Sequence, residues 1–177
     1  MTDWIYTTNK DNTARYTLGR DGKRVLFCIG INPSTAEPDK LDPTLKRVEN
    51  LAHDNNYDGW IMLNVYPQRA THPDDIHHEA DKNYHKANIE AIRLITNQYP
   101  APDILAAWGT VIQKRKYLMS CLPDIVKAIG DKARWRHLGE LTKYGHPRHP
   151  LYVAKTITFN TFDIHTYINP DGKRNTY

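Results

Sequence analysis

Hydrophobic residues along this chain gather in short runs that are separated by polar segments. Four runs have the length and composition of β-strands: VLFCIGI at 25–31, GWIMLNVYP at 59–67, DILAAWG at 103–109 and RWRHLGE at 134–140. The first three are apolar at nearly every position. Strands that are buried on both faces have this continuous pattern, which is typical of parallel sheets.

The segments between these runs carry apolar residues at helical spacing. Residues 42–55 place Leu45, Val48 and Leu51 on one stripe of a helix. Further helices are predicted at 80–100 and from about 110 to 129. This alternation of strands and helices predicts an α/β fold, with three α/β/α layers around a central, mainly parallel four-stranded sheet.

One more strand is expected near the N-terminus. The run ARYTLGR at 14–20 is followed by Asp21-Gly22 and then by the first central strand. Asp-Gly is a favoured two-residue turn, so the pattern predicts a β-hairpin between these two runs. No repeat or linker divides the sequence, and we therefore expect residues 1–177 to form a single domain.

Composition and charge narrow the class of protein only slightly. The chain has 177 residues, 40% hydrophobic and 25% charged, as globular proteins do. Its apolar runs are too short to span a bilayer, and its N-terminus lacks a signal-peptide pattern. Cys28 and Cys121 lie in apolar segments, which favours buried thiols and a cytoplasmic location. The net charge of +4 permits a polyanionic partner without requiring one.

Polar residues follow the predicted strands at their carboxyl ends. They are Asn32 and Ser34 after the first strand, Asn64 in the second, Thr110 after the third and His146 beyond the fourth. Ligands of parallel α/β sheets bind at this edge, so the topology predicts a site there. Taken singly, each residue has a simpler explanation, because Asn before Pro33, for example, suits a turn.

Several well-known catalytic patterns are absent from these segments. GINPST at 30–35 lacks the Gly-Lys-Ser/Thr of a phosphate-binding loop, and no G-x-G-x-x-G occurs. Ser34 and His146 could pair as nucleophile and base, but no G-x-S-x-G motif frames the serine. The histidine-rich and acidic segment 72–85 matches no spacing of metal ligands, so we expect no metal site.

As an ordered set, the strand ends resemble the motifs of the uracil-DNA glycosylase superfamily. GINP at 30–33 is similar to its first motif, MLNV at 62–65 to the end of its second strand, and LAAWG at 105–109 to its third strand. HPRHPL at 146–151 resembles its histidine loop with one extra residue. The resemblance spans about residues 25–152 and implies the same core fold.

A closer resemblance concerns a family without an assigned activity. NPSTA at 32–36, DPT at 42–44 with Arg47, and GHPRHPLY at 145–152 resemble an uncharacterised prokaryotic family catalogued as domain of unknown function 1643. That resemblance implies no chemistry by itself.

The glycosylase resemblance implies hydrolysis of an N-glycosidic bond in a nucleic acid or nucleotide, without a cofactor. Asn32 would place the attacking water, since an amide oxygen can hold water but is no strong base. Asn64 would read the edge of the base. His146 would donate a hydrogen bond to the departing base as negative charge develops on it.

One feature of the superfamily has no counterpart in this chain. The aromatic residue that stacks on the base after the first motif is missing from residues 34–50. Asp42, Thr44 and Arg47 stand there instead, and they could bind a phosphate, a ribose or a carboxylate. A simpler reading is that Asp42 or Thr44 caps the helix and Arg47 pairs across its surface.

The loop after the fourth strand would contact the expected partner, a nucleic acid or nucleotide. Arg148, His149 and Tyr152 would touch phosphates or fill the gap that a flipped base leaves. Two alternatives stay open. The same cleft could bind a nucleotide or nucleic acid without catalysis. Alternatively, the chain could be a small-molecule enzyme of other chemistry around Asp42, Thr44, Arg47 and His146.

Overall fold

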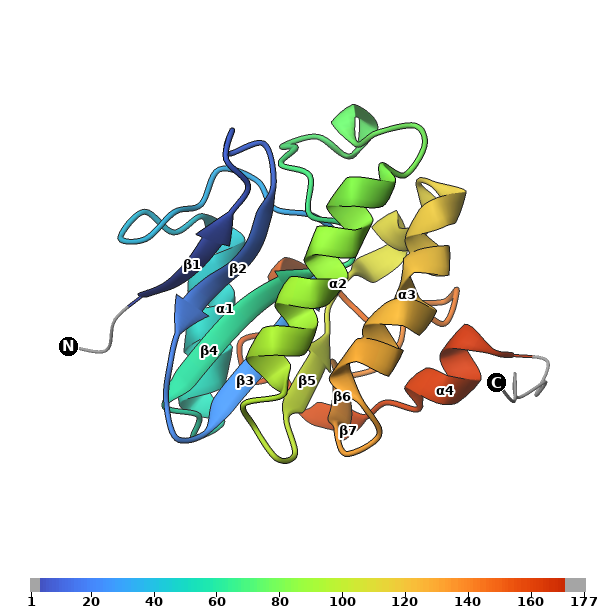
Figure 1. Cartoon of the computed structure of the whole chain (residues 1–177). Coiled ribbons are helices and arrows are strands. Elements are labelled where there is room, and N and C mark those ends of the chain that lie inside the picture. Colours follow the sequence, from blue (N-terminus) through green and yellow to red (C-terminus); the bar gives the residue numbers. More distant parts are fainter. Residues whose placement is uncertain (1–3, 171–177) are drawn as a thin grey trace.

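The computed structural model describes residues 4–170, and its strands form one seven-stranded sheet (Figure 1). The strands are β1 (Trp4–Thr8), β2 (Arg15–Arg20), β3 (Val25–Gly30), β4 (Gly59–Asn64), β5 (Asp103–Ala106), β6 (Arg134–Leu138) and β7 (Phe159–Thr161). Their order across the sheet is β1-β2-β4-β3-β5-β6-β7. β3 pairs in parallel with β4 and β5, and β5 pairs in parallel with β6. The other neighbouring pairs are antiparallel, so the sheet is mixed. Two of its strands, β1 and β7, were not predicted from the sequence.

Four α-helices lie within the described residues, and the predicted ones are present. They are α1 (Pro43–Asp54), α2 (Lys82–Thr96), α3 (Lys116–Ile129) and α4 (Ile164–Ile168). The Asp42 carboxylate caps α1 by accepting a 2.9 Å hydrogen bond from the Leu45 backbone N–H. The third predicted helix begins later than expected, because a 3₁₀ turn, η2 (Gly109–Gln113), and the extended residue Arg115 precede it.

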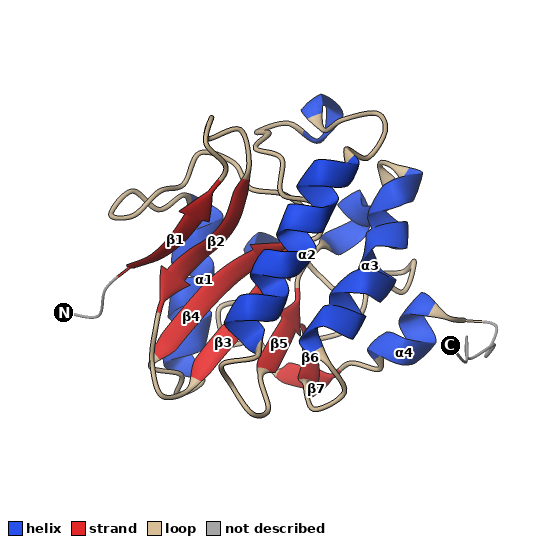
Figure 2. Cartoon of the chain, viewed as in Figure 1, coloured by secondary structure: helices blue, strands red, loops and turns tan. Residues whose placement is uncertain are grey.

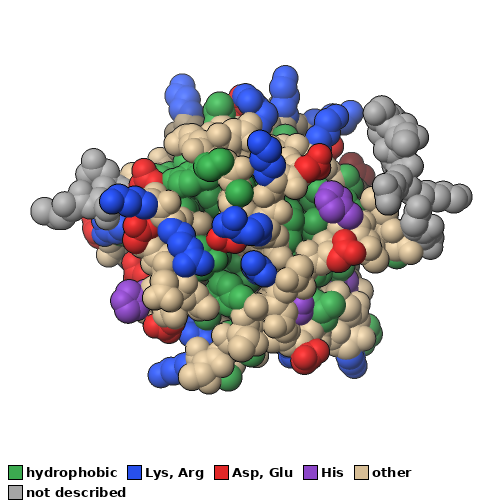
Figure 3. Space-filling model, turned by 90° about the horizontal axis from the view of Figure 1, so that it is seen from below, with side chains coloured by type: hydrophobic (Ala, Val, Ile, Leu, Met, Phe, Trp, Pro, Cys, Tyr) green, Lys and Arg blue, Asp and Glu red, His purple; other side chains and the backbone are tan. Residues whose placement is uncertain are grey.

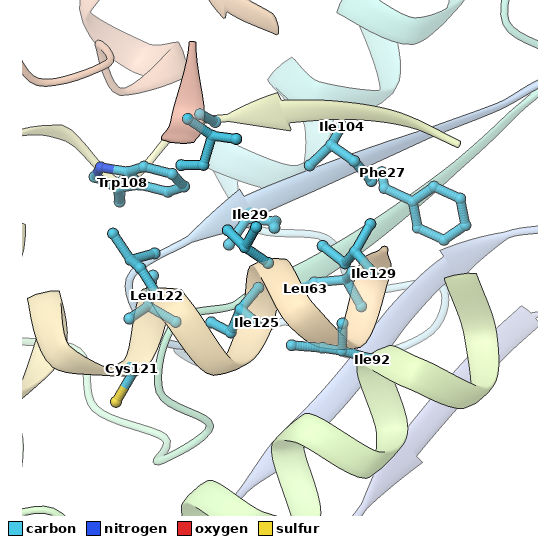
Figure 4. Close-up of a cluster of buried hydrophobic side chains, with 14 of the residues drawn as sticks. Phe27, Ile29, Leu63, Ile92, Ile104, Trp108, Cys121, Leu122, Ile125 and Ile129 are labelled. Atoms are coloured by element: carbon cyan, nitrogen blue, oxygen red, sulfur yellow. The ribbon is translucent and has the colours of Figure 1, made fainter. Parts of the chain in front are cut away.

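Helices cover both faces of the sheet, with α1 behind it and α2 and α3 in front (Figure 2). Successive residues of β3 point to opposite faces, as the period of a strand requires. Phe27 and Ile29 pack with residues of α2 and α3, among them Ile125 (Figure 4). Leu26 and Cys28 pack with residues of α1. The uninterrupted apolar run of β3 follows from this burial on two sides.

The predicted hairpin between 14–20 and the first central strand is wrong. β2 pairs with β1 and β4, and β4 lies between β2 and β3. The Asp21-Gly22 segment therefore crosses over the start of β4, where a Cβ on Gly59 would lie 2.8 Å from the backbone of residues 20–22. Residues 21 and 22 form no turn, and the long-range pairing of β2 and β3 with β4 prevails over the local preference of Asp-Gly. The antiparallel hairpin of the fold is β1–β2.

Charges of both signs share the surface shown in Figure 3. Lys and Arg side chains lie there among Asp and Glu and among exposed hydrophobic side chains. On this face, the Lys and Arg side chains are spread among acidic ones and form no single basic patch. None of the helices in residues 4–170 is long and apolar enough to cross a membrane.

Candidate functional site

A cavity of about 450 Å³ opens at the carboxyl edge of the sheet, beside the start of α1. Gly30 at the end of β3 and Trp108 just beyond β5 both line it. The chain leaves β3 toward β4 on one side and returns to β5 on the other, so the cavity lies at a topological switch point. Ligands of open α/β sheets bind at such points. The volume lies within the ~300–1,000 Å³ of small-molecule sites.

The fold brings most of the predicted site residues to this cavity. Those that line it are Asn32, Ser34, Asp42, Thr44, Arg148, His149 and Tyr152. Asn64 and His146 are buried beside the strand ends without lining the cavity, and Arg47 does not line it either. Within residues 4–170, no group of three or more His, Cys, Asp or Glu side chains is placed to hold a metal ion.

The Asn32 amide is held in one orientation at the end of β3. Its Nδ2 donates hydrogen bonds to the carbonyls of Ala70 at 2.8 Å, Pro33 at 2.9 Å and Gln68 at 3.3 Å. Because these three acceptors face the nitrogen, the other amide atom must be the oxygen. Oδ1 accepts no hydrogen bond from residues 4–170, and it is the polar group with which Asn32 can serve a ligand.

Asn64, at the end of β4, has a side-chain amide without a partner. It is fully buried, and neither Oδ1 nor Nδ2 makes a hydrogen bond within the described part of the chain. Asn64 is the register partner of Gly30, and its Oδ1 lies 3.9 Å from the point where a Gly30 Cβ would be. The Met62 methyl group lies 2.6 Å from the same point. The flexible Met62 side chain, which lines the cavity, therefore occupies the space beside this amide.

His146 is buried and belongs to a chain of hydrogen bonds that ends in α4. The Trp108 indole N–H donates to the Tyr167 hydroxyl at 3.1 Å, and that hydroxyl lies 2.7 Å from His146 Nδ1. With its oxygen accepting from Trp108, the hydroxyl still has a hydrogen that it can donate to Nδ1, and we assign the pair in that direction. The proton of the neutral imidazole is then on Nε2, which has no partner within residues 4–170. Burial lowers the pKa of His146 and so favours the neutral ring.

The loop that carries His146 is shaped by a tight turn. The Thr142 N–H donates to the His146 carbonyl at 2.9 Å, and the Gly145 N–H donates to the Thr142 carbonyl at 2.8 Å. Gly145 has a φ of 78°, a conformation that suits glycine. The Arg148 Nε donates to the Glu140 carbonyl at 2.7 Å, which anchors the following residues.

His149 and Asp42 line the cavity from two different elements, Asp42 at the start of α1 and His149 at the start of a short 3₁₀ helix. His149 precedes the short 3₁₀ helix η3 (Pro150–Tyr152) and accepts a 3.3 Å hydrogen bond from the Leu151 N–H through Nδ1. Burial lowers the pKa of His149, and the negative charge of Asp42 opposes that shift. Arg47 has a different task, because its Nη2 donates at 2.6 Å to the Ala154 carbonyl and ties α1 to the segment after η3.

Arg15, which the sequence pattern did not single out, also lines the cavity. It begins β2 and is only 1% exposed, and its Nη1 donates at 3.0 Å to the Ala36 carbonyl. Burial is the main cause that lowers the pKa of Arg15 to about 10, and the neighbouring Arg69 adds to it. The signal in the sequence that could have identified it is the position of a charged residue, Arg15, inside the predicted strand at 14–20. Tyr167 was missed too, since it lies outside the motif-bearing segment.

Comparison with known proteins identifies a family for this chain, and that family has no assigned activity. A family model described as protein of unknown function (DUF1643) matches residues 15–151. The match begins at Arg15 and extends through the loop that carries His146 and His149. No curated protein and no solved structure matches the chain.

Proposed function

We propose that this chain, which belongs to the family described as protein of unknown function (DUF1643), hydrolyses an N-glycosidic bond in a nucleotide or nucleic acid. Three polar groups at the carboxyl edge carry the proposal: Asn32 Oδ1, the Asn64 amide and His146 Nε2. None of them has a partner within residues 4–170. Asn64 and His146 are buried, and buried polar groups in proteins are nearly always hydrogen-bonded, so we infer that a ligand engages both. Asn32 is half-buried and lines the cavity, where its Oδ1 would contact the same ligand.

The proposed fold relationship is to the uracil-DNA glycosylase superfamily. The adjacent strands β4, β3, β5 and β6, all parallel, support it, because Asn32, Asn64 and His146 follow three of them in the order that the resemblance requires. β1, β2 and β7 would be additions at the two sides of this core. Helices on both faces are consistent with the same three-layer arrangement.

In the proposed reaction, water adds to the anomeric carbon of the sugar while the carbon–nitrogen bond breaks. The bonding electron pair leaves with the base, and the sugar passes through an oxocarbenium-like state. The proton that the water loses on bonding to the sugar is taken up, through solvent, by the departing base anion. Asn32 Oδ1 accepts a hydrogen bond from the water and orients it. An amide takes up no proton, so stabilising the departing base must supply much of the rate.

His146 is suited to that second task. Its Nε2–H would donate to the base oxygen on which negative charge develops. Tyr167, positioned by Trp108, would hold the required tautomer by donating its hydroxyl hydrogen to Nδ1 across the 2.7 Å contact, while it accepts from the Trp108 indole at 3.1 Å. Removing one such donor typically lowers kcat by about 10²–10³.

Recognition of the base would fall to Asn64 and an aromatic ring at the rim. The Asn64 amide offers one acceptor and two donor hydrogens, which can match a pyrimidine or purine edge. Rotation of the Met62 side chain would connect this amide to the cavity. Tyr152, which lines the cavity and is 79% exposed, could stack on the base in place of the aromatic that residues 34–50 lack.

Release of free base is the direct test. Nucleotides and single- and double-stranded oligonucleotides that contain uracil, hypoxanthine or xanthine are incubated with the protein, and the released base is quantified by chromatography. We expect release from at least one substrate, lowered about 10²–10³-fold by Asn32→Ala and by His146→Gln. Asn97→Ala, at an exposed asparagine after α2, is the matched control and should keep full activity.

Two results would count against the proposal. Absence of base release from every substrate, with salt-sensitive binding to oligonucleotides, would favour a non-catalytic module. Release that persists at the wild-type rate in Asn32→Ala would separate the activity from this site. Tyr167→Phe sharpens the outcome, because it removes only the hydroxyl that sets the His146 tautomer, and we expect a smaller loss than with His146→Gln.

A further inference from the structure

The cavity contains a buried positive charge without a carboxylate partner. Arg15 is 1% exposed, and its Nε makes no hydrogen bond within residues 4–170. Its Nη1 donates to the neutral carbonyl of Ala36. No Asp or Glu of the described residues forms an ion pair with this guanidinium. A charge that is removed from water in this way is costly unless a counter-charge accompanies it.

A second arginine increases the imbalance. Arg69 donates through Nη1 to the Ser34 carbonyl at 2.6 Å and to the Ala36 carbonyl at 3.4 Å, and through Nη2 to the Tyr6 hydroxyl at 2.7 Å. The two guanidiniums thus share the Ala36 carbonyl, and their repulsion disfavours the charged form of Arg15. Neutral oxygens hold both arginines in place without cancelling their charges.

Among the residues that the structure describes, Asp42 is the one acidic residue that lines the cavity. Asp42 attracts Arg15 at longer range, but its Oδ1 accepts the hydrogen bond that caps α1. Arg148 lines the same cavity, so positive charge exceeds negative charge around it. Hydroxyl groups complete the lining. Among them are those of Thr44 and of the pair Ser34 and Thr71, whose oxygens lie 3.2 Å apart.

We propose that Arg15 binds the phosphate of a nucleoside monophosphate, so that the substrate of this site is a free nucleotide. The guanidinium fork suits phosphate oxygens, and the hydroxyl groups can donate to those that remain. A terminal phosphate has a chain on one side only and can reach a buried arginine. An internal phosphodiester continues on both sides and cannot enter as deeply. This inference rests on the proposed function, because the base and sugar are assigned by it.

Binding measurements on the wild-type protein test the proposal first. Isothermal titration calorimetry measures the affinity for uridine and UMP, and for inosine and IMP. Inorganic phosphate is titrated separately for comparison. We expect each monophosphate to bind roughly 10- to 100-fold more tightly than its nucleoside, as a charge-assisted contact provides. A trinucleotide with an internal uridine should bind more weakly than UMP. Equal affinity of nucleoside and monophosphate, or tighter binding of the trinucleotide, would overturn the inference.

Substitution then assigns the effect to one residue. Arg15→Gln should abolish the preference for the monophosphate while leaving nucleoside affinity within about twofold, and Arg15→Lys should restore part of it. Arg93→Gln, which removes an exposed arginine paired with Glu90 on α2, is the control. A preference that survives in folded Arg15→Gln overturns the assignment. If that variant does not fold, the wild-type comparison still decides.

The two proposals can fail separately. Arg15-dependent binding of monophosphates without release of base would retain the phosphate site and remove the glycosidase. Release of base from oligonucleotides, without any preference for monophosphates in binding, would retain the glycosidase and remove the phosphate site.

Discussion

The two faces of the sheet are built from the same strands, yet their carboxyl ends differ. Beneath α2 and α3, β3 and β4 present only apolar side chains that are fully buried: Phe27, Ile29, Ile61 and Leu63. Beneath α1, the apolar side chains stop before the edge, where Gly30 and Asn64 stand opposite each other. The cavity begins at that point.

This difference separates stability from ligand binding within one sheet. The face covered by α2 and α3 is close-packed, so truncation of a buried side chain there leaves a void. On the α1 face, Gly30 supplies space and Asn64 supplies a polar group without a partner. Substitutions on the first face should therefore change the free energy of unfolding, and substitutions on the second should change function.

The largest effect is expected from Leu122→Ala in α3. Leu122 is completely buried against the sheet (Figure 4), and its truncation should lower the free energy of unfolding by about 2–5 kcal/mol. Urea denaturation at equilibrium measures the loss. Base release per folded molecule should stay unchanged, and a cost below about 1 kcal/mol would contradict the role given to this face.

The next largest effect is expected from a comparison of two buried asparagines, Asn64 and Asn88. The Asn64 side chain has no partner, whereas Asn88 Nδ2 donates to the Asn64 carbonyl at 2.8 Å. We expect Asn88→Leu to lower the free energy of unfolding by about 1–3 kcal/mol, and Asn64→Leu to leave it unchanged or to raise it.

Activity should respond in the opposite way to these two substitutions. Asn64→Leu should abolish base release, while Asn88→Leu should retain it in the folded fraction. Denaturation curves and base release are measured on the same preparations. Destabilisation of similar size in both variants would show that the Asn64 amide serves the fold.

Two glycines at opposite edges of the sheet test a smaller difference. Gly145 and Gly130 have φ values of 78° and 87°, and a Cβ on either would meet nothing within 4 Å. Each Gly→Ala substitution should cost about 1 kcal/mol through backbone strain alone. Only Gly145→Ala should also lower activity, because it disturbs the turn that presents His146. Equal activity in both variants would remove that turn from the site.

The smallest change is expected from mild acidification, which removes no atom from the fold. Burial lowers the pKa of His146 and of His149 below their ordinary value of 6.5. The unfolded chain then binds protons first as the pH falls, so stability is present above about pH 6.5 and declines below it. The thermal midpoint should drop between about pH 7.5 and about pH 5.5. A double His146→Gln, His149→Gln variant should reduce this dependence to what remains from His137, whose pKa burial also lowers, and an unchanged slope would exclude these two residues.

Much of the secondary structure was predictable because it depends on near neighbours. The stripe of Leu45, Val48 and Leu51 and the Asp42 cap specify α1 within a few residues of sequence. The apolar runs mark β3, β4 and β5 for the same reason. The position of Asn32 at the carboxyl edge followed from a general rule of parallel sheets, which needs no knowledge of individual contacts.

Pairing partners and buried charges were not predictable in this way. The Asp21-Gly22 dipeptide indicated a hairpin, but β4, which lies some forty residues later in the chain, inserts between β2 and β3. Arg15 reaches the cavity only because β2 lies beside β4 and the segment around Ala36 folds back over it. Tyr167 meets His146 through α4, beyond the motifs that suggested the site.

By itself, the sequence determined the helices, the central strands and the edge at which polar residues collect, since periodicity and capping act over a few residues. Only the tertiary structure decided which of those residues line the cavity, which are buried behind it without partners, and that Arg15 carries a charge into it. These properties depend on contacts between segments far apart in the chain, whose free energy no local pattern records.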